Sequence, residues 1–180
     1  MKHAILLIII LAVLFLPTPS YAEDKEPETV AVEATEKGWR YFGIGDKATA
    51  LKRFRQATIL DPGYAPAYYG VAYIYSLQDR LSLAIQYYRK AIELADSPDT
   101  HAYGNLGLAL IKLGKRAEGL QMVQKALAID PDNSEAHIGL ASFYCAEKNG
   151  KLAREHLERG KSLGAQPGPE LIGLLKTTCP

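Results

Sequence analysis

The sequence predicts an all-α solenoid made of four helix–turn–helix repeats and a short C-terminal capping helix. Three observations carry this prediction. Small residues recur at intervals of 34, 35 and 34 residues, large apolar residues recur at the same intervals, and aspartate closely followed by proline ends three of the units. A period in this range is typical of stacked helical hairpins, because one hairpin alone cannot bury its apolar face.

A targeting signal precedes the repeats. Lys2 is followed by an unbroken apolar run over 4–16, which as a helix would span roughly 20 Å, short of the ~30 Å hydrocarbon core of a membrane. Two prolines end this run, and small residues lead up to Ala22. The pattern predicts a secretory signal peptide over 1–22, cleaved after Ala22, and hence a periplasmic or secreted protein. An uncleaved membrane anchor is the alternative.

The composition excludes several classes of partner. The chain has 21 lysines and arginines against 20 aspartates and glutamates, a formal net charge of +1, so no field of one sign would attract nucleic acid. After the signal no apolar run of about 18 residues follows, so we expect no stable membrane insertion once the signal is cleaved. The acidic residues of 23–30 predict a flexible leader of the mature chain.

The remaining chain divides into four repeats and a tail. The repeats are predicted over 31–64, 65–99, 100–133 and 134–167, and the capping helix and tail over 168–180, with a partner-docking helix as the alternative for the last segment. Apolar spacings of three and four predict two helices in each repeat. First helices are predicted at 33–43, 66–77, 101–113 and 134–147, and second helices at 47–60, 81–95, 116–129 and 152–163.

Small residues in the two helices of a repeat are expected to face each other, because they let the backbones approach closely. The four expected pairs are Gly38 with Ala50, Ala72 with Ala84, Gly107 with Gly119, and Ala141 with Ala153.

The pattern of residues that recurs in the four repeats resembles that of the tetratricopeptide repeat family. The first repeat carries GWRYFGIGDKATALKRFRQATILDP, which is similar to the family pattern at nearly every defining place. The third carries NLGLALIKLGKRAEGLQMVQKALAIDP, whereas the fourth departs, with Gly160 and Ala165 where alanine and proline are usual. The resemblance covers 31–167 and suggests an exported bacterial member. It implies a right-handed superhelix whose concave face, lined by the first helices, holds a peptide or helix of another protein.

The geometry of the first helices indicates which side chains would line that face. The predicted peptide-binding groove consists of Thr35, Trp39, Phe42, Tyr69, Tyr73, Ser76, His101, Asn105, Leu108, Lys112, Ile138 and Ser142. Its N-terminal half is aromatic, which favours hydrophobic anchoring of a peptide. Aromatic residues at helical spacing are also common in cores, and for Trp39, Tyr69 and Tyr73 this alternative stays open.

One ligand class of the family does not fit this chain. Some members clamp a C-terminal aspartate or a chaperone tail with a lysine–asparagine–arginine set. The matching places here hold Thr35, Trp39, Gly70, His101 and Asn105, with a single amide and neither lysine nor arginine. We therefore expect no chaperone-tail receptor.

Enzymatic function is not predicted. The sequence has no HExxH motif, no paired CxxC and no phosphate-binding Gly-Lys-Ser loop. His101, His137 and His156 have no second histidine at ligand spacing, so we expect them on the surface or partly packed. We predict no catalytic residues, no metal site and no cofactor.

Cys145 and Cys179 are candidates for a disulfide, since an oxidising compartment favours pairing. They lie one period apart, which in a regular fifth helix would separate them by about 9–10 Å, beyond the roughly 7 Å that a disulfide spans. The tail could bend inward. An internal bond, two thiols and a link to a partner therefore all stay open.

The sequence as a whole predicts a protein–protein interaction scaffold or assembly factor in the bacterial cell envelope, with a partner that the sequence does not identify. One alternative is a regulatory subunit that presents a client to an envelope enzyme, such as a cytochrome-maturation or peptidoglycan enzyme. A second is a self-associating structural array. A monomer is favoured, although the oligomeric state stays open.

Overall fold

The structure is a computed structural model that describes residues 26–177, so the predicted signal peptide and Cys179 lie outside the described residues. All regular structure in the described part is helical, which confirms the predicted fold class. The helices are α2 (Pro27–Gly43), α3 (Lys47–Leu60), α4 (Ala65–Leu77), α5 (Leu81–Leu94), α6 (Thr100–Lys112), α7 (Arg116–Ile129), α8 (Ser134–Ala146), α9 (Gly150–Ser162) and α10 (Pro169–Thr177). Among them, none is both long enough and apolar enough to cross a bilayer.

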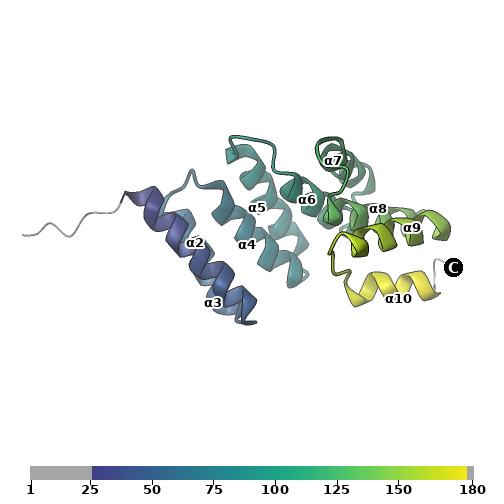
Figure 1. The fold of residues 1–180 in the computed structure, drawn as a ribbon, viewed down its shortest axis with the longest axis horizontal. Helices are drawn as coiled ribbons and strands as arrows, with labels where there is room; N and C mark the ends of the chain where they lie inside the picture. Colours follow the sequence, from purple (N-terminus) through teal and green to yellow (C-terminus); the bar gives the residue numbers. More distant parts are fainter. Residues whose placement is uncertain (1–25, 178–180) are drawn as a thin grey trace, which may run out of the picture.

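The helices pair into four hairpins that follow one another along the long axis of the molecule (Figure 1). Each first helix packs against its own second helix and against the first helix of the next hairpin. The helix α10 lies at the far end, against α8 and α9. Stacking of this kind gives every hairpin a neighbour that covers its apolar face.

Side-chain caps start several helices where the sequence has aspartate or asparagine. The Asp46 carboxylate accepts from the backbone N–H of Thr49 at 2.9 Å, and the Asn133 side chain accepts from that of Ala136 at 2.8 Å. These bonds satisfy N–H groups that have no partner inside the helix. The start of each hairpin's second helix is further fixed by a residue with positive φ just before it, which is Gly45 in the first repeat but Asp79 in the second.

Large side chains of the second helices fit against glycines of the first helices. A methyl group placed on Gly38 in α2 or on Gly70 in α4 would lie 2.5 Å from a ring carbon of Phe54. Phe54, which is fully buried, therefore wedges between two successive first helices. Val123 has the same relation to Gly107 and Gly139 of α6 and α8, at 2.5 and 2.7 Å.

The close approach predicted inside the third hairpin is present. A methyl group on Gly107 would lie 2.8 Å from the carbonyl oxygen of Gly119, and one on Gly119 would lie 2.7 Å from that of Gly107. The two backbones touch, so neither position has room for a side chain.

The predicted leader over 23–30 is too long at its C-terminal end. The helix α2 begins at Pro27, a residue that fits the first turn of a helix, and Glu28 follows in the same turn. One turn further, Ala31 and Ala34 are buried in a small cluster with alanines of α3 and α4. This burial extends the helix beyond the point where composition alone ends it.

Candidate binding groove

A cavity of about 660 Å³ lies along the face of the stack that the first helices form. All four first helices contribute to it: Phe42 from α2, Tyr73 and Ser76 from α4, Asn105, Leu108 and Lys112 from α6, and Ile138 from α8. The connection from α9 to α10 and the start of α10 form its far wall. The cavity therefore spans the length of the array rather than one repeat.

A second cavity of about 440 Å³ adjoins the first near α10. The two share Leu108, Lys112, Ile138, Gly168 and Glu170. Ser142 and Cys145 of α8 line the second cavity on one side, and Leu171 and Leu174 of α10 line it on the other. Leu171 and Leu175 of α10 are buried against the last hairpin, which places α10 as a wall of the groove.

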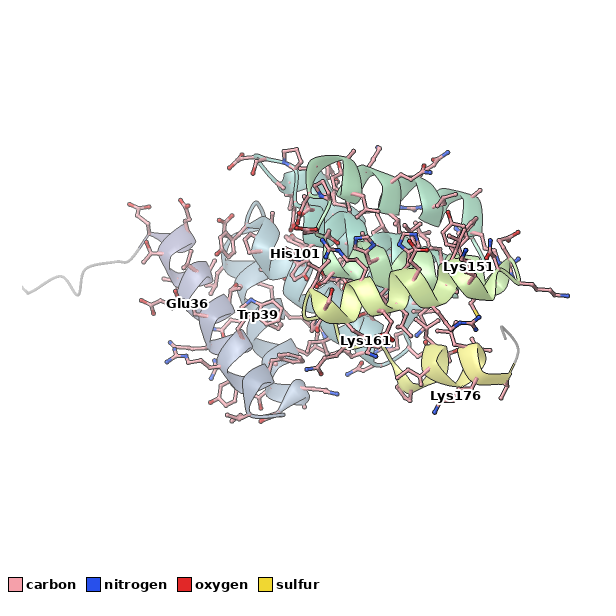
Figure 2. All side chains as sticks on the ribbon, turned by 45° about the vertical axis from the view of Figure 1, so that its right-hand side comes forward. Glu36, Trp39, His101, Lys151, Lys161 and Lys176 are labelled. Atoms are coloured by element: carbon pink, nitrogen blue, oxygen red, sulfur yellow. The ribbon has the colours of Figure 1, made fainter. Side chains whose placement is uncertain are left out.

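An aromatic cluster supports the N-terminal end of the larger cavity. The Trp39 ring centroid lies 5.8 Å from those of Phe42 and Tyr73 and 6.1 Å from that of Tyr69. Figure 2 shows Trp39 on the side of α2 toward α4, whereas Glu36, one turn before it, points away from the stack. The Tyr69 and Tyr73 rings stack with an interplanar angle of 17°.

The hydroxyls of this cluster are neutral hydrogen-bonding groups. Burial raises the pKa of Tyr69 and Tyr73 above the ordinary value, with the nearby Glu135 carboxylate acting in the same direction. The Asn105 side-chain amide donates to the Tyr69 hydroxyl at 3.1 Å and to the His101 carbonyl at 3.1 Å. Tyr69 is thus held in position by a hydrogen bond from α6, whereas Tyr73 lines the cavity itself.

The structure sorts the predicted groove residues into two groups. The residues that line one or both cavities are Phe42, Tyr73, Ser76, Asn105, Leu108, Lys112, Ile138 and Ser142. The other four lie around them. Trp39 and Tyr69 form the aromatic support, and Thr35 lies deeper, with only 4% of its surface exposed. His101 is exposed and places Nδ1 3.2 Å from a carboxylate oxygen of Glu135.

Acidic side chains at the rim were not predicted. The Lys112 ammonium lies 3.4 Å from the Asp79 carboxylate and 3.3 Å from that of Glu170. This one cation therefore links the turn between α4 and α5 to α10. Neither carboxylate lies on a first helix, and the sequence prediction considered first helices alone. Asp79, in the turn between α4 and α5, and Glu170, in the first turn of α10, line the same cavity.

Two histidines form a pair that their sequence spacing does not suggest. His137 Nδ1 lies 3.0 Å from His156 Nδ1, and His137 Nε2 lies 3.1 Å from the Pro131 carbonyl oxygen. Burial and the neighbouring His137 lower the pKa of His156. Within the described residues, no group of three or more histidine, cysteine, aspartate or glutamate side chains is arranged to hold a metal ion.

Cys145 is buried at the second cavity. Its proposed bond to Cys179 stays a prediction, because Cys179 lies outside the described residues.

Comparison with known proteins identifies the repeats. Models of the tetratricopeptide repeat match residues 35–99 and 110–176. Over 104 residues, or 58% of the chain, the sequence is 29% identical to "Protein CTR9 homolog" of Arabidopsis thaliana. Over 151 residues, or 84% of the chain, it is 24% identical to "TPR repeat-containing protein YpiA" of Bacillus subtilis (strain 168). The matched regions are 10% and 35% of these relatives, so the chain spans a minor part of each.

Solved structures share the arrangement. The first tetratricopeptide domain of Spaghetti (RPAP3), bound to an HSP90 peptide, superposes with a TM-score of 0.62 and 26% identity, covering 67% of this chain and 94% of that domain. MamA superposes with a TM-score of 0.61 at 22% identity, covering 74% of this chain and 77% of its own. A chain of the Cut9–Hcn1 assembly superposes with a TM-score of 0.67 at 16% identity, covering 84% of this chain and 30% of its own. For MamA and the Cut9–Hcn1 assembly, both under 25% identical, the likeness extends to the fold alone.

Proposed function

Because the chain belongs to the tetratricopeptide repeat family, we propose that it is a non-catalytic binding module that holds a peptide or helix of another protein in its groove. The observation that carries the proposal is the cavity of about 660 Å³, which receives side chains from all four first helices. A continuous hollow of this kind suits an extended or helical guest.

The aromatic end of the groove supplies the anchor. Phe42 and Tyr73 are half-buried and contact each other at 5.4 Å between ring centroids, so part of each ring still faces the cavity. Rings held in place by neighbours lose little entropy when a guest covers them, which is why aromatic side chains often dominate binding energy. The RPAP3 domain, which is 26% identical and nearly fully covered, is bound to an HSP90 peptide, and this supports peptide binding by the same fold.

The test compares two tyrosine variants in peptide binding. Short random-sequence peptides displayed on phage are selected against the purified protein, and the affinities of the selected peptides are then measured. Tyr73→Ala should weaken them by about ten-fold or more, as expected for an aromatic anchor. The matched control is Tyr87→Ala on α5, which also removes a half-buried ring but away from the cavity. Equal effects of the two variants, or no selected peptide at all, would contradict the proposal.

We further propose that the module acts outside the cytoplasm, as a scaffold or assembly factor in the bacterial cell envelope. The support is the pattern of 1–22, in which a basic start, an apolar run and small residues come in the order of a signal peptide. Expression in a bacterium, fractionation and intact mass measurement test this. We expect an exported chain that starts at Glu23, and a full-length cytoplasmic chain would be evidence against it.

A further inference from the structure

The charges around the larger cavity are unevenly divided. In the part of the chain that the structure describes, its charged lining residues are the carboxylates of Asp79, Glu135 and Glu170 and the ammonium of Lys112. Three carboxylates against one cation leave a formal excess of two negative charges. The whole chain carries a net charge of only +1, so this excess belongs to the groove rather than to the surface in general.

The single cation cannot neutralise its neighbours. Lys112 is shared between Asp79 at 3.4 Å and Glu170 at 3.3 Å, and both carboxylates are mostly exposed, at 76% and 67%. Ion pairs this exposed contribute little and exchange partners readily, so a cation from a guest can join or replace them. Lys112 itself is less exposed, at 33%, and lines the cavity together with the two carboxylates.

Glu135 adds a negative charge from the first turn of α8. It is half-buried on α8, and its carboxylate meets His101 Nδ1 at 3.2 Å and the Ser134 hydroxyl at 3.1 Å. Among the described residues, no lysine or arginine pairs with Glu135, so its carboxylate is available to a cation of the guest. The larger cavity thus has carboxylates beside an aromatic and aliphatic floor formed by Phe42, Tyr73 and Leu108.

We propose that the partner segment has an aromatic or aliphatic anchor flanked by lysine or arginine, an inference that rests on the proposed peptide-binding function. The anchor side chain covers the floor of the larger cavity, and the flanking cations meet Asp79, Glu135 and Glu170. The apolar floor alone would bind peptides with different flanking charges at similar affinity. Complementary charge makes the affinity higher for those with basic flanks. Tyrosine faces beside the floor add attraction for a cation.

The larger cavity has few cationic or free donor groups that could bind an acidic peptide. His101 faces Glu135, and the Asn105 amide already donates to Tyr69 and to a backbone carbonyl. The adjoining smaller cavity differs, since it is lined by Arg116 and Lys148 as well as Lys112, against Glu170. We therefore expect an acidic peptide to bind in the smaller cavity. The preference for lysine or arginine beside the anchor belongs to the larger cavity.

The first arm of the test uses the phage-selected peptides. We expect lysine or arginine to be enriched next to an aromatic or aliphatic residue, and replacing these cations with glutamate should weaken binding by about ten-fold or more. The preference should shrink as salt is raised, because exposed charges are screened. Selected peptides that are acidic, or that have no charge preference, would overturn the inference while leaving peptide binding intact.

The second arm removes the carboxylates without changing their shape. The triple variant Asp79→Asn, Glu135→Gln, Glu170→Gln should bind lysine-flanked and glutamate-flanked versions of one peptide equally. The control triple variant Glu93→Gln, Glu118→Gln, Glu158→Gln removes the same charge from α5, α7 and α9 and should keep the preference. Each of these glutamates pairs with a lysine or arginine outside the cavity.

The outcomes of the two proposals are separable. If Tyr73→Ala has no effect or no peptide is selected, the groove function itself fails. If Tyr73→Ala weakens binding but the groove triple variant keeps the basic preference, only the charge inference fails. An acidic preference that is lost in the Arg116→Gln, Lys148→Gln variant would place the guest in the smaller cavity instead.

Discussion

The side chains of Asn105 and Tyr69 join the third repeat to the second through a hydrogen bond of 3.1 Å. The same amide nitrogen donates to the His101 carbonyl one turn earlier in α6, which fixes the direction in which Asn105 points. Asn105 is 8% exposed, so this polar contact lies almost out of reach of water. Asn105 also lines the larger cavity, so the bond connects the stability of the stack to the position of Tyr69.

Removal of this amide should destabilise the protein. Asn105→Ala leaves the Tyr69 hydroxyl buried without its donor, and we expect a loss of about 1–3 kcal/mol in the free energy of unfolding. Urea denaturation followed by circular dichroism measures it. The double variant Tyr69→Phe, Asn105→Ala should lose clearly less than the sum of the single variants, because no hydroxyl is then left unpaired. Strict additivity would show that the bond contributes nothing.

The contact between two backbones in the third hairpin makes a second prediction. Gly107→Ala places a methyl group 2.5 Å from a Val123 methyl carbon and 2.8 Å from the Gly119 carbonyl oxygen. Because a backbone atom cannot move aside as a side chain can, α6 and α7 must separate, and we expect a loss of about 1–3 kcal/mol or more. Thermal or urea unfolding of the purified variant gives the value.

The matched control for Gly107 is Gly43, which also lies in a helix. A methyl group on Gly43 meets nothing within 4 Å, so Gly43→Ala should be neutral or should stabilise α2 by up to about 1 kcal/mol. If Gly107→Ala loses no more stability than Gly43→Ala, the close approach of the two backbones does not govern this position.

The repeats could be predicted from the sequence because their period is a direct consequence of packing. Phe54 recurs as Tyr88 one period later, and Gly38, against which Phe54 packs, recurs as the small residue Ala72. Several helix starts also have a local cause in the sequence, such as the capping carboxylate of Asp46. Local signals and periodic signals agree in these hairpins, so the fold follows from them.

The site was only partly predictable from the sequence. Helical spacing indicates which side chains share a face of a helix, but it does not indicate how deeply each of them is buried. Thr35 and Phe42 belong to the same face of α2, yet Thr35 is buried while Phe42 lines the cavity. The difference comes from the neighbouring helix, which no spacing within α2 reveals. The segment from Pro169 onward has no complete repeat to align with, so the sequence did not show that Glu170 would reach Lys112.

The stacked histidines of the last hairpin make a third prediction, on pH. The Pro131 carbonyl can only accept, so neutral His137 carries its proton on Nε2 and offers the Nδ1 lone pair to the Nδ1–H of His156. The Tyr144 ring stacks on His156 from the other side. Burial, then the charge of His137, lower the pKa of His156 below its ordinary value of 6.5, and the nearby Glu155 opposes them more weakly.

A histidine with a lowered pKa in the folded state makes unfolding easier in acid. Between the two pKa values the unfolded chain binds the proton and the folded chain does not, so the free energy of unfolding should fall as pH drops below about 6.5. Urea titrations at a series of pH values measure this fall, which His156→Gln should flatten. His101→Gln serves as the control, since His101 is exposed and faces Glu135. If the wild-type curve stays flat through this range, or if His156→Gln leaves its slope unchanged, the histidine pair does not resist protonation.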